Sequence, residues 1–210
     1  MTLISVLVAN AKGGCGKTTI ATNLATVFAN AGLRTAIADA DRQRSCRTWN
    51  KLRPKDVPQI EVLDWRRSIG EPPAGIERLV IDSGAGLRSR HVQELLRRAS
   101  FLVMPVLPSV FDEKATRDFL KRVEELKPVR KGSKPVVVVG NRVRPRTRAE
   151  THLQEFLGAL GHEVAARFQD RSLYQDVARR GLGVFDLSPA RRAGVVKDWL
   201  PLVRRIESQA

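Results

Sequence analysis

The octapeptide Lys12-Gly13-Gly14-Cys15-Gly16-Lys17-Thr18-Thr19 is the most informative part of this chain. It follows an apolar, β-branched run over residues 3–9, which is typical of a buried strand, and a long helical pattern begins directly after it. A glycine-rich loop between a strand and a helix binds phosphate, because its backbone N–H groups can turn toward phosphate oxygens. We therefore predict a phosphate-binding loop whose nucleotide contacts come from Gly13, Gly14, Cys15, Gly16, Lys17, Thr18 and Thr19.

Two side chains of this loop have definite chemical roles. Lys17 places a positive charge at the β- and γ-phosphates, and Thr18 offers its hydroxyl to Mg²⁺. The helix predicted over residues 17–31 points its positive dipole end at the same phosphates. Lys17 is accordingly a predicted catalytic residue, and Thr18 is a predicted metal ligand.

The loop departs from the usual G-x-x-x-x-G-K-[ST] pattern, because Ala11 stands where a glycine is usual and Lys12 is an additional lysine. In the form K-G-G-x-G-K-[ST]-T it resembles the deviant phosphate loop (a deviant Walker A motif) of the ParA/MinD ATPases. In that family the first lysine reaches across a two-fold dimer to the nucleotide held by the partner subunit. The resemblance implies that Lys12 is a catalytic residue that acts between subunits.

Three aspartates follow predicted buried strands. Asp39 and Asp41 end the strand over residues 35–38, and Asp82 ends the strand over residues 79–82. Ligands of open parallel sheets bind at the carboxyl ends of the strands, so all three carboxylates can face the phosphate loop. A carboxylate near Mg²⁺ holds metal waters, and one near the γ-phosphate orients the attacking water.

The resemblance distributes these roles among the aspartates. It implies that Asp41 positions the water and is catalytic, and we assign Asp82 to a metal-bound water. For Asp39 two roles stay open, a metal ligand or a brace for the loop. The family usually continues D-x-D-P-Q-G-[ST], whereas this chain has Arg42 and Arg44 in place of the proline and the glycine. Both replacements add charge and put the local turn in doubt.

Segments beyond the loop extend the resemblance to about residue 186. The run over residues 104–109 with Asp112 matches V-x-P-S-x-x-D, and residues 171–184 resemble R-x-x-Y-x-x-A-x-x-G. Asn141 and Arg142 occupy the base-recognition position and are predicted nucleotide contacts. Guanine-specific relatives have N-K-x-D there, but the fourth position in this chain is Arg144, which can only donate hydrogen bonds. We therefore expect ATP rather than GTP.

Strand and helix patterns alternate along the chain. This alternation predicts an α/β fold, with one doubly wound, mostly parallel sheet, helices on both faces and a single domain over residues 1–210. The expected strands cover residues 3–9, 35–38, 60–63, 79–82, 101–106 and 135–140, and the expected helices cover 17–31, 42–52, 92–99, 114–126 and a segment opened by a capping box at Thr147. A last apolar stripe at Val195, Trp199, Leu202, Val203 and Ile206 is expected to be a core-packing helix, interrupted or restarted at Pro201.

The bulk composition limits the partners of the protein. A formal net charge of +15 favours polyanions, above all nucleic acid, with acidic lipid as the next candidate. Because aromatic residues make up only 5% of the chain, duplex DNA contacted through its phosphates is expected rather than stacked single strands. The predicted DNA contacts are Arg144, Arg146, Arg148, Arg167, Arg171, Arg191 and Arg192.

Together these features predict a small ParA-like ATPase that binds ATP and Mg²⁺, forms a nucleotide-sandwich homodimer and then binds nonspecific double-stranded DNA. Hydrolysis stimulated by a ParB-like or cargo-adaptor protein would release it, and the purpose implied by the resemblance is plasmid or chromosome segregation or the positioning of a protein cargo. We expect a cytoplasmic, nucleoid-associated protein, since no apolar run of about 18 residues or signal peptide is seen.

One alternative is a MinD-type membrane-cycling ATPase. The other is an iron–sulfur-handling enzyme on the same fold, for which Cys46 lacks a neighbouring cysteine.

Overall fold

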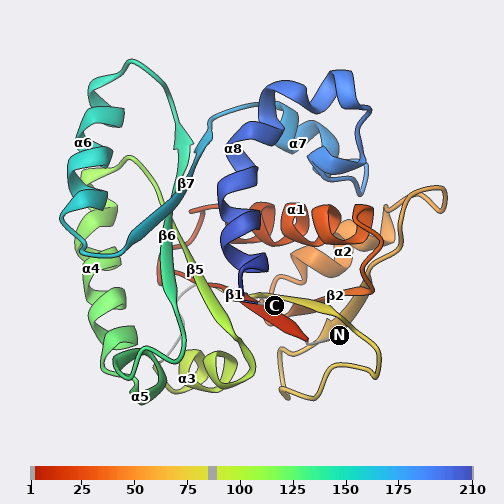
Figure 1. Ribbon diagram of the computed structural model, residues 1–210, viewed down its shortest axis with the longest axis horizontal. Helices are drawn as coiled ribbons and strands as arrows, with labels where there is room; N and C mark the ends of the chain where they lie inside the picture. Colours follow the sequence, from red (N-terminus) through yellow and green to blue (C-terminus); the bar gives the residue numbers. More distant parts are fainter. Residues whose placement is uncertain (1–2, 85–88, 210) are drawn as a thin grey trace.

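The computed structural model describes residues 3–84 and 89–209, and its centre is a parallel sheet of seven strands (Figure 1). The strand order is β3-β2-β4-β1-β5-β6-β7, so the strand that leads into the phosphate loop lies in the middle. The strands are β1 (Ile4–Val8), β2 (Thr35–Asp39), β3 (Glu61–Asp64), β4 (Arg78–Asp82), β5 (Phe101–Val106), β6 (Val136–Val143) and β7 (Glu163–Gln169). The predicted doubly wound α/β fold is thereby confirmed.

Helices cover both faces of this sheet. In Figure 1, α3 to α6 lie on one side, while α1, α2, α7 and α8 lie on the other. The helices of the first group are α3 (Ser89–Arg98), α4 (Val110–Glu124), α5 (Lys127–Arg130) and α6 (Arg148–Gly158). Those of the second group are α1 (Lys17–Asn30), α2 (Ser45–Lys51), α7 (Leu173–Ala178) and α8 (Pro189–Glu207), with the short 3-10 helix η1 (Val184–Asp186) beside them.

The inner strands of the sheet contribute to two separate cores. In β1, Val6 and Val8 pack into the core under α1 and α8, while Leu7 packs into the core under α3 and α4. Successive side chains of a strand point to opposite faces, so a strand covered on both sides must be apolar at every position. This requirement explains the unbroken apolar runs that predicted the buried strands.

Several elements differ from the sequence prediction. β7, α7 and η1 were not predicted, and β6 continues past Gly140 to Val143, which places Asn141 inside the strand. The predicted capping box is half formed: Thr147 Oγ1 accepts the N–H of Glu150, but the carboxylate of Glu150 accepts the N–H of Arg146 instead of that of Thr147. The sequence after Asp82, Ser83-Gly84-Ala85-Gly86, also predicts a mobile γ-phosphate sensor, and Ala85 and Gly86 of that segment lie outside the described residues.

The prediction that the last helix breaks at Pro201 was wrong. α8 runs from Pro189 to Glu207 without interruption, and Pro201 lies on its exposed side. A proline inside a helix removes one hydrogen bond, but here water can satisfy the freed carbonyl. Trp199 and Leu202 on the opposite side are buried in the core with α1 and β7, as expected from the apolar stripe. Within the described ranges, no helix has both the length and the apolarity to cross a membrane.

Candidate nucleotide-binding site

The phosphate loop is fixed at both ends by asparagine side chains. The amide of Asn10 donates to the carbonyl of Pro105 at 2.8 Å, and its oxygen accepts the N–H of Lys12. At the other end, Asn141 Nδ2 donates to the carbonyl of Cys15 at 2.8 Å. Gly16 has φ 92°, and a Cβ there would lie 2.1 Å from Asn141 Nδ2, so only glycine fits. Asn141 therefore holds the loop itself, a role that the base-recognition resemblance did not indicate.

Lys17 points into the loop. Its ammonium donates to the carbonyl of Lys12 at 2.8 Å and lies 3.8 Å from Cys15 Sγ, and the residue is 7% exposed. An ammonium held by a single loop carbonyl in a concave ring of N–H groups can be drawn to phosphate oxygens, which carry far more negative charge than a carbonyl. This placement is compatible with the predicted role of Lys17 at the phosphates, which stays a prediction.

Asp82 receives two hydrogen bonds on one oxygen. Thr18 Oγ1 donates to Oδ2 at 2.7 Å, and the thiol of Cys46 donates to the same oxygen at 3.1 Å. Burial raises the pKa of Asp82 to about 7, and the two hydrogen bonds oppose that rise. The other oxygen, Oδ1, is buried and has no partner within the described part of the chain.

These atoms suit a hydrated Mg²⁺ ion. The hydroxyl hydrogen of Thr18 is already used by Asp82, which leaves the lone pairs of that oxygen for a cation, and the unpartnered Oδ1 of Asp82 can accept a metal-bound water. Among residues 3–84 and 89–209, no group of three or more His, Cys, Asp and Glu side chains could hold a metal by itself. A cation here would be shared with nucleotide phosphates, as is usual for Mg²⁺.

The carboxylate of Asp39 is occupied by backbone donors. Its Oδ1 accepts the N–H of Asp41 at 3.1 Å and its Oδ2 accepts the N–H of Arg47 at 3.0 Å. Burial raises the pKa of Asp39, and these N–H groups oppose the rise. Such bonds match the bracing role considered from the sequence, while metal coordination by Asp39 stays a prediction.

Asp41 is less enclosed than Asp39. Its Oδ1 accepts the N–H of Gln43 at 3.0 Å. A Cβ on Gly84, just past the end of β4, would lie 3.4 Å from Asp41 Oδ1, so the ends of β2 and β4 come together here. This position at the carboxyl edge of the sheet is compatible with a water-positioning role.

Lys12 lies at the rim of the loop and faces α4. Its ammonium forms an ion pair with Asp112 Oδ1 at 2.8 Å, and the Lys12 side chain is 44% exposed whereas that of Asp112 is 8% exposed. Two segments that matched the same family pattern therefore meet in space. Sequence reasoning identified each segment but did not identify the contact between them.

Arg142 and the arginines predicted to contact DNA differ in exposure and in their side-chain partners. Arg142 is exposed with φ 53°, and within the described residues no side-chain hydrogen bond joins it to the loop. Arg144 pairs with Asp170 at 2.8 Å. Arg171 turns inward and donates to Gln169 Oε1 and to the carbonyl of Gly194, so it does not lie on an open surface. Arg192 donates to the carbonyl of Phe185, whereas Arg146, Arg148, Arg167 and Arg191 are exposed.

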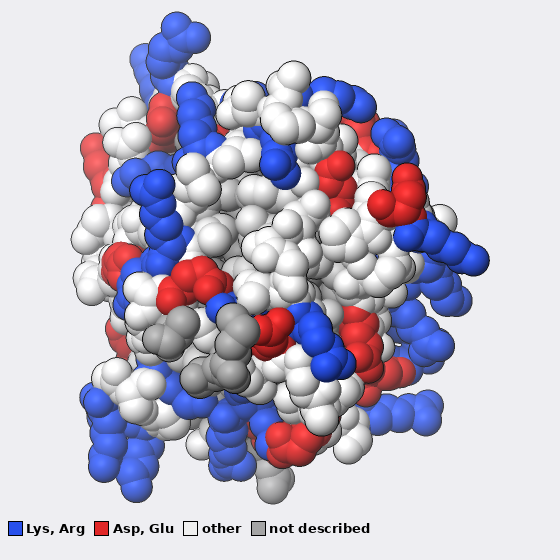
Figure 2. Space-filling view, turned by 45° about the vertical axis from the view of Figure 1, so that its right-hand side comes forward, with Lys and Arg blue, Asp and Glu red and all other residues white. Residues whose placement is uncertain are grey.

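The surface charge is spread over several elements. Figure 2 shows Lys and Arg side chains around much of the outline of one face, with acidic side chains between them. Arg146 and Arg148 stand at the start of α6, and Arg191 stands at the start of α8. The exposed arginines thus come from several elements of the fold.

Cys46 is the functional-site residue that sequence reasoning missed. It was considered only as half of a cysteine pair, yet its thiol contacts Asp82 and the residue is fully buried. The available signal was its position: it lies in the first turn of the helix that follows Asp39 and Asp41, at the same edge of the sheet. Burial raises the pKa of the Cys46 thiol well above its usual value, so it acts as a hydrogen-bond donor.

Comparison with known proteins places these features in a family. Residues 6–181 match the sequence profile of the family described as the CobQ/CobB/MinD/ParA nucleotide binding domain. This chain belongs to that family. The CobQ/CobB/MinD/ParA match contains the phosphate loop, the three aspartates and Asn141, while α8 lies beyond it.

Individual relatives agree with this assignment. Maintenance of carboxysome distribution protein A of Halothiobacillus neapolitanus is 28% identical over 196 residues, which cover 90% of each chain. The MinD cell division protein of Aquifex aeolicus has a TM-score of 0.76 at 17% identity and covers 99% of this chain and 98% of its own. A plasmid partition protein of Borrelia burgdorferi B31 bound to AMPPNP has a TM-score of 0.75 at 15% identity, with coverages of 97% and 100%. At these identities the two structures show a shared fold.

Proposed function

We propose that this protein is a ParA-type positioning ATPase, which dimerises around ATP and Mg²⁺ and then binds DNA without sequence preference. The observation that carries the proposal is the pair of lysines in one loop, with Lys17 buried inside it and Lys12 exposed at its rim. A buried lysine serves the nucleotide of its own subunit. An exposed lysine at the rim is free to serve a second subunit once its ion pair with Asp112 opens.

The proposed hydrolysis depends on positioning and charge. Lys17 and the loop N–H groups bind the phosphates, and Thr18 and Asp82 hold the cation and one of its waters. Mg²⁺, when bound, neutralises charge on the β- and γ-phosphates. Asp41 accepts a hydrogen bond from the attacking water and orients it toward the γ-phosphate. Asp39 keeps the backbone of Asp41 in place through the N–H bond already described.

DNA binding is proposed from charge. A net charge of +15 attracts duplex phosphates, and dimerisation would double the charge on one particle. Exposed Arg146, Arg148, Arg167 and Arg191 are the proposed contacts, with Arg144 available if its pair with Asp170 opens. Arg171 is dropped from this set because its guanidinium points inward.

The proposed cargo is a protein assembly inside the cell. The name of the Halothiobacillus relative, whose match extends over 90% of each chain, supports an assembly over a plasmid. A partner that recognises the ATP-bound dimer would stimulate hydrolysis and release the protein from DNA. The apolar stripe that the membrane-cycling alternative would need in α8 is used by the core, because Val195, Trp199, Leu202 and Ile206 are buried.

The first experiment is binding of random-sequence duplex DNA with ATP, with ADP and without nucleotide, over a series of salt concentrations. The proposal requires tight binding with ATP that falls steeply with salt and is lost in Lys12→Ala. Lys127→Ala, which removes an equal charge at α5 far from the loop in sequence, is the matched control and should bind nearly as well as the parent. Equal binding with ATP, with ADP and without nucleotide would contradict the proposal. It would mean that the basic surface attracts any polyanion.

A further inference from the structure

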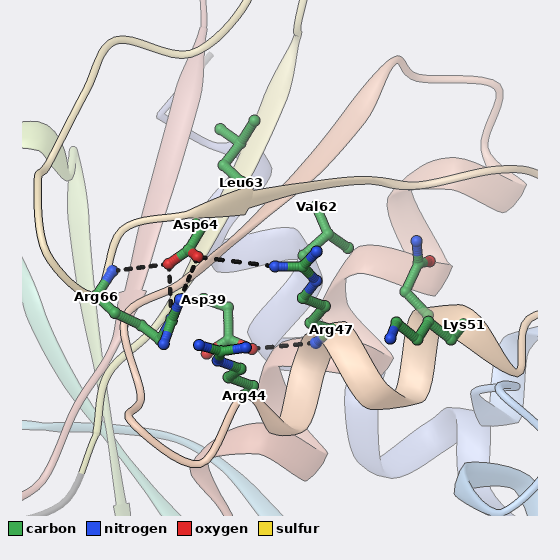
Figure 3. A pocket seen from close by; sticks show the side chains of 9 residues that line it. Asp39, Arg44, Arg47, Lys51, Val62, Leu63, Asp64 and Arg66 are labelled. Atoms are coloured by element: carbon green, nitrogen blue, oxygen red, sulfur yellow. Dashed lines mark hydrogen bonds and ion pairs between the residues drawn. The ribbon is translucent and has the colours of Figure 1, made fainter.

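A cavity lies beside the candidate nucleotide-binding site, between α2 and the ends of β2 and β3 (Figure 3). Its volume is about 350 Å³. It is separated from the phosphate loop by the strand end that carries Asp39. The residues that line it are Asp39, Arg44, Arg47, Asn50, Lys51, Val62, Leu63, Asp64 and Arg66.

Four cationic side chains but only two carboxylates line this cavity. Arg66 neutralises Asp64, with Nε 2.7 Å from Oδ1 and Nη2 2.5 Å from Oδ2. This hydrogen-bonded pair lowers the pKa of Asp64 to about 2. Asp39 turns both oxygens to backbone N–H groups, as described above. Neither carboxylate is therefore free to form a close ion pair with the remaining cationic side chains of the cavity.

The three remaining cations are Arg44, Arg47 and Lys51. Arg47 Nη1 lies 3.8 Å from Asp64 Oδ2, which is beyond hydrogen-bond distance. Neither Arg44 nor Lys51 forms an ion pair or a side-chain hydrogen bond with the part of the chain that the structure describes. In Figure 3 the side chains of Arg44 and Arg47 converge beside Asp39 and Asp64. The cavity thus carries an excess of positive charge that an anion could bind.

Arg44 is held in a conformation that suits glycine. Its φ is 57°, in the left-handed region, and it closes a turn in which its N–H donates to the carbonyl of Asp41 at 3.1 Å. The family resembled by this sequence usually has glycine at this position. A side chain in this region is strained, and such residues concentrate at functional sites. The chain therefore keeps a guanidinium at the cavity despite a local conformational cost.

The other lining residues indicate what kind of anion fits. Asn50 Oδ1 is buried and lacks a donor within the described residues, and Val62 and Leu63 form an apolar wall. A glutamate or aspartate side chain offers a carboxylate for the arginines, methylene groups for the wall, and a peptide N–H for Asn50. A DNA backbone offers no N–H of this kind.

We propose that this cavity binds an acidic side chain of a protein partner, with Arg44, Arg47 and Lys51 as its cationic contacts. Binding of an acidic side chain in this cavity does not depend on the proposed ATPase function, but the effect of that binding on hydrolysis rests on it. Arg47 N–H holds Asp39, and Arg44 N–H holds the carbonyl of Asp41. An acidic partner that pulls on these arginines acts directly on the segment that carries the water-positioning aspartate.

The test measures binding of a fluorescent hexaglutamate peptide to the full chain without nucleotide, by anisotropy. Arg44→Gln and Arg42→Gln form a charge-matched pair, because Arg42 is exposed in the same turn but does not line the cavity. Loss of a charge-assisted contact should weaken binding about tenfold in Arg44→Gln, and by less than about twofold in Arg42→Gln. Arg44→Gly keeps the left-handed turn and should fold at least as well as the parent while losing the same affinity.

Three results would overturn the proposal. Equal weakening in the two glutamine variants would mean that net charge alone attracts the peptide. Loss of duplex DNA binding without loss of peptide binding in Arg44→Gln would assign the cavity to DNA phosphate. Competition by inorganic phosphate but not by unlabelled hexaglutamate would assign it to a small free anion. Because peptide binding is measured without nucleotide and only the DNA comparison is made with ATP, a failure of ATP-dependent DNA binding would leave the peptide result unaffected.

Discussion

The ammonium of Lys12 lies 2.8 Å from Oδ1 of Asp112, and the two partners differ sharply in exposure. The carboxylate is fixed in the first turn of α4, whereas the lysine extends from the rim of the phosphate loop. The family resemblance implies that Lys12 contacts the nucleotide of the partner subunit, but here Asp112 of the same subunit holds its ammonium. Reaching across a dimer requires that this ion pair first open.

Asp112→Asn should consequently favour dimerisation. Removing the ion pair frees Lys12. Each half-exposed pair contributes up to about 1 kcal/mol and a two-fold dimer opens two of them, so the ATP-dependent dimer should become up to about thirtyfold tighter. Sedimentation with a non-hydrolysable ATP analogue measures this, with Lys12→Ala as the variant that should not dimerise. A dimer weakened in Asp112→Asn would instead mean that Asp112 aligns Lys12 in the assembled state.

Cys46→Ala should weaken the response to Mg²⁺. The substitution removes one of the two donors that orient Asp82, and a single hydrogen bond contributes about 1 kcal/mol, or about fivefold in affinity. The half-saturating Mg²⁺ concentration for ATP binding should rise by that factor, and Cys46→Ser, which keeps a donor, should restore it. An unchanged Mg²⁺ dependence, with normal folding, would show that Thr18 alone orients the carboxylate.

The single tyrosine allows a direct test of pH dependence. Burial raises the pKa of Tyr174 to about 12, while the indole N–H of Trp199 donates to its oxygen and opposes the rise. Because the folded pKa lies above the ordinary value of 10.0, the stability from this group is complete below about pH 10 and is lost as pH rises through 12. Phenolate absorbance should titrate near pH 12 in the folded protein and near 10 in denaturant. A folded protein that titrates at 10 would contradict the burial of the ring.

Asp186→Asn should destabilise the fold strongly. The side chains of Asp186 and Arg53 are 0% and 1% exposed, and both guanidinium nitrogens that face Asp186 lie 2.9 Å from its oxygens. Removing one partner of a buried pair leaves an uncompensated charge and costs about 3–5 kcal/mol of the free energy of unfolding. Urea unfolding measures the loss. Asp170→Asn, whose partner Arg144 is 75% exposed, is the control and should cost about 1 kcal/mol or less.

The nucleotide half of the molecule could be predicted from sequence because its signals are local. Glycines in the loop and apolar runs in the central strands act over a few residues, and each carboxylate follows directly on its strand. β7 was missed because exposed and buried residues are mixed along it, and polar Glu163 and Arg167 interrupt the apolar pattern. An edge strand is covered less completely, so its sequence carries less of the signal that identified the others.

Contacts between distant segments could not be predicted in the same way. The ion pair of Lys12 with Asp112, the thiol bond of Cys46 to Asp82 and the inward turn of Arg171 each depend on side-chain directions that the packed fold sets. The turn at Arg44 is a related case. The sequence put it in doubt because glycine was missing, but the structure keeps the turn and an arginine adopts the left-handed conformation.

The central position of β1 has a consequence for the order in which the site can assemble during synthesis. β1 pairs with β4 and β5, so Ile4 is aligned with Arg78 and Val8 with Val103, and the loop is closed by Asn141. The first segment of the binding site to leave the ribosome is therefore held in place by segments made much later. A nascent chain that ends before β6 carries the whole phosphate-loop motif and yet lacks the asparagine that holds it.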